Sequence, residues 1–86
     1  MKVLVTAASK HGATAEIAAA IGAGLRRRGL EVAVVPAEQA GSLSGYDAVV
    51  LGSAVYGGHW LEPALALADR SAAALRSHPV WLFSSG

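Results

Sequence analysis

Short apolar runs alternate with helical stretches along the chain. The apolar runs are typical of buried strands, and they fall at residues 2–7, 30–35, 48–51 and 80–83. Apolar residues at helical spacing predict one helix from Thr14 to Arg28 and a second from Pro63 to about Ser77. The Ser- and Gly-rich stretch 37–46 is at most weakly helical. This alternation predicts an α/β domain with right-handed crossovers and a parallel sheet.

Two glycines interrupt the first predicted helix. Gly22 and Gly24 each cost about 1 kcal/mol relative to alanine inside a helix. We expect the helix to approach the sheet closely at these positions, which would offset that cost. The helix is expected to stop at Gly29.

Composition narrows the class of protein. Hydrophobic residues make up 53% of the 86 residues and charged residues only 15%, as suits a sheet covered on both faces. A net charge of +1 gives no indication of a nucleic-acid or acidic-membrane partner. The absence of cysteine excludes disulfides, thiolate metal sites and cysteine nucleophiles. The first apolar run is too short for a signal peptide or a membrane span, so we expect a soluble cytoplasmic protein.

The last predicted strand has no covering helix. After residues 80–83 only Ser84, Ser85 and Gly86 follow, whereas parallel sheets are normally covered on both faces. We therefore expect a single domain, residues 1–86, that is truncated after its fourth strand. An unpaired apolar edge strand can pair with another chain, so self-association through this strand is also expected.

The loop after the first strand is suited to an anion. Gly12 lets the backbone approach a ligand closely, and the dipole of the following helix favours a dianion. Lys10 can add positive charge or point into solvent. Ser9 and Thr14 could instead cap the helix, and this loop alone leaves both interpretations open. The candidate binding residues are Ser9, Lys10, His11, Gly12, Ala13 and Thr14.

Other phosphate-binding loops do not match this segment. A nucleotide P-loop needs Gly-Lys-Ser/Thr, which the chain lacks. A dinucleotide fingerprint needs three glycines directly after the first strand, and this loop has one. A receiver domain needs a cluster of carboxylates at the strand ends, where none is found.

The stretch after the third strand, Ser53 to Trp60, combines glycines with aromatic residues. A flat heterocycle needs an aromatic face and backbone donors, and this composition supplies both. We expect Tyr56 to contact a ligand. Packing of the second helix against the sheet is favoured over ligand contact for Trp60, and a solvated or helix-entry position is favoured for His59.

Hydrolytic and metal chemistry find little support. Ser9 or Ser53 could be drawn into a triad with a histidine and an aspartate, but no Gly-x-Ser-x-Gly elbow is present. Asp47 lies at the amino end of its strand, which is the wrong edge of the sheet. The three histidines lack metal-ligand spacing. No catalytic residue and no metal site are therefore predicted.

Three segments together resemble the flavodoxin family. The segment "KVLVTAASKHGATAEIA" resembles the first strand and FMN-phosphate loop, whose pattern is hydroxyl-x-hydroxyl-Gly-x-Thr. Ser9, Gly12 and Thr14 match that pattern, while His11 replaces the middle hydroxyl. "YDAVVLGSAVYGGHW" is similar to the third strand and isoalloxazine loop, and its Tyr-Gly-x-His is closest to the menaquinone-dependent protoporphyrinogen IX dehydrogenase branch. "VWLFSSG" resembles the fourth strand and the start of a third flavin loop.

The resemblance implies a three-layer, doubly wound parallel sheet of order 2-1-3-4, with the fifth strand of the family missing. It implies FMN as cofactor, held at its phosphate by residues 9–14 and bordered at its ring by two later segments. These are Ser53, Ala54, Val55, Tyr56, Gly57 and Gly58, followed by Ser84, Ser85 and Gly86. The implied function is redox chemistry at FMN, with a porphyrinogen or quinone as a further partner. A flavodoxin-type electron carrier, or a fragment that retains no flavin, is the alternative.

Overall fold

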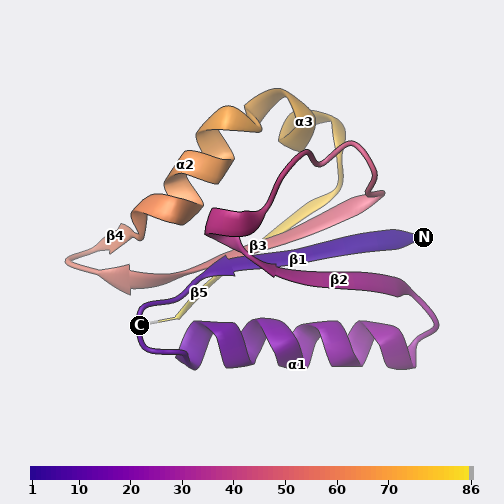
Figure 1. Cartoon of the computed structure of the whole chain (residues 1–86), viewed down its shortest axis with the longest axis horizontal. Helices are drawn as coiled ribbons and strands as arrows, with labels where there is room; N and C mark the ends of the chain where they lie inside the picture. The colour runs from indigo at the N-terminus through magenta and orange to yellow at the C-terminus, as the bar shows by residue number, and fades with distance from the viewer. Residues whose placement is uncertain (86) are drawn as a thin grey trace.

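The computed structural model describes residues 1–85 as a parallel sheet between two helical layers (Figure 1). Helix α1 covers one face, and the short helix η1 with α2 and α3 covers the other. The strands are β1 (Lys2–Ala8), β2 (Glu31–Pro36), β3 (Ala48–Tyr56), β4 (His59–Trp60) and β5 (Val80–Ser85). The helices are α1 (Ala13–Arg27), η1 (Ala37–Gln39), α2 (Glu62–Arg70) and α3 (Ala72–Ser77). Within this part of the chain, no helix is long and apolar enough to cross a membrane.

The parallel strands follow the order β2-β1-β3-β5, which confirms the predicted order 2-1-3-4 because β5 is the fourth predicted strand. The register places Val5 of β1 opposite Val34 of β2 and Val50 of β3. Strand β3 is therefore central, and its end carries the short antiparallel strand β4.

Alternate residues of the central strands build two cores. Val3, Val5 and Val50 pack toward α1, whereas Leu4 and Leu51 pack toward α2 with Leu67. Most of these side chains are at least 95% buried. The continuous apolar runs of the sequence thus reflect strands that are covered on both faces.

Close approach offsets the cost of one of the two helical glycines. A Cβ atom on Gly22 would lie 2.6 Å from Cγ2 of Val34, so α1 can pack this closely on β2 only with glycine here. A Cβ on Gly24 would meet only the Arg27 side chain, at 3.7 Å. The expectation of close approach is confirmed for Gly22 and is wrong for Gly24.

Strand β3 is longer than the four residues predicted, because it continues through Gly52 to Tyr56. The run of small residues here reads as a loop, yet it pairs with β1 as far as Ser53 and with β5 as far as Ala54. The chain then reverses through Gly57 and Gly58, whose φ values are 58° and 78°. Two positive φ values are what a two-residue type I′ hairpin turn requires.

The second predicted helix is two helices. Helix α2 ends at Arg70, and Ser71, with φ −110° and ψ 14°, begins α3. Serine competes with the backbone for hydrogen bonds and is a weak helix former, which explains why the break falls at this residue.

Candidate functional site

The carboxyl ends of β1, β3 and β5 meet at one edge of the sheet (Figure 1). The loop that leads into α1, the hairpin after β3 and the end of β5 all lie at this edge. They enclose a pocket of about 180 Å³, and its lining is Ser9, Lys10, His11, Ala13, Thr14, Ala54, Val55, Tyr56 and Ser85. Each of these residues was expected from the sequence to bind a ligand.

The first loop is held by one hydrogen bond of its own. The backbone N–H of Gly12 donates to Oγ of Ser9 at 3.0 Å. Gly12 is the N-cap residue of α1, with φ 92°, and no side chain in the described part of the chain caps the helix. The hydroxyls of Ser9 and Thr14 therefore do not cap α1. The backbone N–H groups of the first turn can then donate to a ligand. Thr14 is buried within the first turn and borders the pocket.

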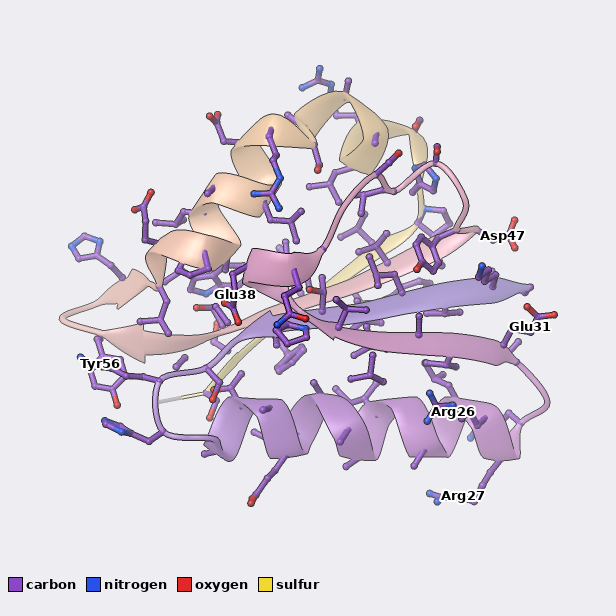
Figure 2. The ribbon with its side chains drawn as sticks, viewed as in Figure 1. Arg26, Arg27, Glu31, Glu38, Asp47 and Tyr56 are labelled. Atoms are coloured by element: carbon purple, nitrogen blue, oxygen red, sulfur yellow. The ribbon has the colours of Figure 1, made fainter. Side chains whose placement is uncertain are left out.

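Tyr56, at the end of β3, contacts the loop after β1. Its ring is 43% exposed, and Nζ of Lys10 lies over it, 4.5 Å from the ring centroid. The ring of His11 meets it edge-on, with centroids 6.0 Å apart and planes at 67°. Figure 2 shows Tyr56 reaching toward the loop after β1. The tips of the two candidate segments are thus in contact through these side chains.

Residues 4–86 match the model of the flavodoxin domain. The chain belongs to the flavodoxin domain family.

Solved flavodoxin structures share this fold. A flavodoxin from the domain Archaea is 27% identical, with a TM-score of 0.80 over 87% of this chain and 54% of that one. A short-chain flavodoxin associated with a PDU bacterial microcompartment is 20% identical, with a TM-score of 0.88 over 100% of this chain and 61% of that one. A cysteine-to-alanine mutant of flavodoxin from Pseudomonas aeruginosa is 22% identical, with a TM-score of 0.76 over 95% and 59%.

The present flavodoxin domain therefore spans between 54% and 61% of the length of these structures. A sequence comparison with curated proteins finds no match. FMN is the cofactor that membership of the family implies.

The pocket of this flavodoxin domain fits the phosphate of FMN. Its lining includes Lys10 and, from the first turn of α1, Ala13 and Thr14. Ammonium, hydroxyl and first-turn amide groups are the donors that a phosphate dianion takes. Among the described residues of the lining, none carries a carboxylate. The labelled charges of Arg26, Arg27 and Glu31 lie at the far end of the sheet from Tyr56 (Figure 2). Its volume is below the ~300–1,000 Å³ typical of sites for whole ligands, so it suits the phosphate end.

Ser53 lies apart from the pocket. Its side chain is fully buried, and Oγ accepts the N–H of Leu61 at 2.9 Å and donates to the carbonyl of Ala54 at 2.7 Å. Leu61 is the residue that precedes α2. Ser53 therefore fixes where α2 starts, a role that its position in the sequence does not reveal.

Gly57, Gly58 and Ser84 border the pocket region without lining it. The two glycines form the hairpin turn beyond Tyr56. The Oγ of Ser84 accepts a hydrogen bond from Nε1 of Trp60 at 3.0 Å, which joins the hairpin to β5. Trp60 packs on the α2 side of the core, as the packing interpretation expected. Gly86 lies outside the described residues.

Proposed function

We propose that this chain is an FMN-binding redox domain of flavodoxin type. Residues 9–14 hold the phosphate, and Ala54, Val55 and Tyr56 border the isoalloxazine ring together with the Gly57–Gly58 turn and Ser85. The observation that carries this proposal is the pocket itself, where three strand ends bring hydroxyls, amides, a cation and an aromatic ring together.

Each part of the pocket has a separate task. Bound FMN supplies electron transfer through its isoalloxazine ring. The first-turn amides of α1 and Lys10 neutralise the phosphate, and Gly12 keeps the backbone in the left-handed conformation that presents those amides. Tyr56 offers an aromatic surface at the mouth of the pocket. No protein acid or base is required for this chemistry.

Titration of the purified chain with FMN tests the proposal. Binding is followed by the quenching of flavin fluorescence. Thr14→Val and Ser9→Ala are expected to weaken binding by roughly tenfold each, the effect of one lost hydrogen bond to a charged group. Ser42→Ala is the matched control, because Oγ of Ser42 accepts a backbone N–H, that of Ser44, in an exposed loop outside the pocket. Wild-type protein that ignores added FMN refutes the proposal.

Within this class, we propose a protoporphyrinogen dehydrogenase-like reaction rather than an electron carrier. The support is the Tyr56-Gly57-Gly58-His59 sequence, which forms a hairpin beside the pocket. A net charge of +1 also fits poorly with the acidic character common among carriers. Anaerobic mixing of the FMN-loaded protein with protoporphyrinogen IX is expected to bleach the flavin absorbance, and menaquinone is expected to restore it. Failure of the porphyrinogen to bleach a flavin that dithionite does bleach favours the carrier.

We also propose self-association through β5. Trp81 and Leu82 are 58% and 66% exposed, and the strand contains no charge or proline to block pairing. The N–H of Val49 donates to the carbonyl of Pro79, so the backbone groups of Val80, Leu82 and Ser84 point to the open edge. Antiparallel pairing of two copies about Leu82 would place Trp81 of each beside Phe83 of the other.

Sedimentation velocity tests this pairing. The wild-type chain is expected to dimerise at micromolar concentrations, and Trp81→Lys is expected to stay monomeric. Val34→Lys is the control, because Val34 is 36% exposed on β2, which lies at the opposite edge of the sheet from β5. A wild-type chain that is monomeric at high concentration contradicts this part of the proposal.

A further inference from the structure

Lys10 and Tyr56 make a contact that phosphate binding by Lys10 does not require. The ammonium of Lys10 lies 4.5 Å above the centre of the Tyr56 ring, and both residues line the same pocket. The cation suited to a phosphate therefore covers the ring face suited to a flat heterocycle. The two groups of the pocket suited to the phosphate and to the ring are therefore in contact with each other.

We propose that Lys10 is a specificity-determining residue that leaves the Tyr56 ring for the flavin phosphate, and so selects FMN over riboflavin. The inference rests on the proposed function, because it assumes that the pocket takes a flavin. It deepens that function by giving Lys10 two opposite effects, one for flavins with a phosphate and one for flavins without.

The ammonium of Lys10 can contact either the Tyr56 ring or a flavin phosphate. An exposed cation–π contact is weak, whereas a hydrogen bond between an ammonium and a phosphate dianion is among the stronger polar contacts. The lining offers Lys10 no carboxylate among the described residues, so the Tyr56 ring is its partner there. When FMN binds, Lys10 exchanges its contact with the ring for a stronger contact with the phosphate. Riboflavin has no phosphate, so it must displace Lys10 from the ring without providing a new partner for the ammonium.

His11 holds the ring without competing for its face. Its imidazole meets Tyr56 at an interplanar angle of 67° in an edge-on contact, so the two rings are not stacked. When Lys10 moves, His11 can remain and keep Tyr56 in place. The exchange therefore needs only the rotation of one flexible, exposed lysine side chain.

The test measures FMN and riboflavin affinities for three forms of the 86-residue chain: wild type, Lys10→Ala and Lys10→Met. Lys10→Ala is expected to weaken FMN binding about tenfold and to tighten riboflavin binding about two- to fivefold. Lys10→Met loses the charge but keeps a long chain that can cover the ring. It is expected to weaken FMN binding as much as alanine does, with riboflavin affinity changed by less than about twofold.

A direct measurement on the flavin-free protein accompanies the titrations. The ε-methylene protons of Lys10 are expected to show an upfield ring-current shift in NMR spectra, and Tyr56→Leu is expected to abolish it. If Lys10→Ala changes the FMN and riboflavin affinities by the same factor, or if no ring-current shift is seen, the inference is overturned while the proposed function stands. A wild-type protein that binds neither flavin refutes the proposed function, and the inference with it.

Discussion

Replacement of Gly52 by alanine is expected to destabilise the centre of the sheet. Gly52 lies in β3 directly opposite Phe83 of β5, and the ring of Phe83 covers it so closely that an added Cβ would overlap three ring carbons. The ring must therefore move off the sheet, away from the core that it shares with Val50. Overpacking of this kind costs about 1–3 kcal/mol.

For a chain of 86 residues that cost lowers Tm by roughly 5–20 °C, which thermal unfolding followed by circular dichroism measures directly. A double-mutant cycle isolates the cause. Phe83→Ala removes the ring, so Gly52→Ala in that background is expected to cost less than about 0.5 kcal/mol. An equal cost with and without the ring would falsify the assignment of the strain to Phe83 and locate it in the backbone.

Other substitutions test single features of the fold and the site. Thr6→Val is expected to raise stability by about 1 kcal/mol, because the fully buried hydroxyl of Thr6 has no hydrogen-bond partner among residues 1–85; a lower urea midpoint would contradict this. Ser53→Ala removes the acceptor of the partly buried N–H of Leu61 and is expected to cost about 1 kcal/mol in urea unfolding; an unchanged midpoint would show that water replaces the hydroxyl. Gly58→Ala places a side chain at φ 78° in the hairpin turn and is expected to cost about 1 kcal/mol, whereas Gly41→Ala, in open space without a positive φ, is its control.

The fold was predictable where the sequence pattern and the packing agree. Parallel strands buried on both faces produce continuous apolar runs, and these located β1, β2 and β5 closely. The pattern failed in β3 because its second half is Gly52, Ser53 and Ala54. These residues are small since Phe83 lies over one and the start of α2 is fixed by another. Small residues that allow close packing carry little hydrophobic signal, so the second half of this central strand looked like a loop.

The site was predictable at the level of segments but not of side-chain contacts. Parallel strand ends meet at one edge, so sequence order alone brings residues 9–14, the end of β3 and the end of β5 together. Which side chain in a segment faces the pocket depends on the strand alternation, and that could be assigned only once β3 was known to continue to Tyr56. Ser53 and Ala54 are neighbours, yet one faces α2 and the other lines the pocket. The contact of Lys10 with Tyr56 joins residues 46 positions apart through flexible side chains. No hydrophobic periodicity in the sequence indicates such a contact, and it is the contact on which the proposed choice between FMN and riboflavin rests.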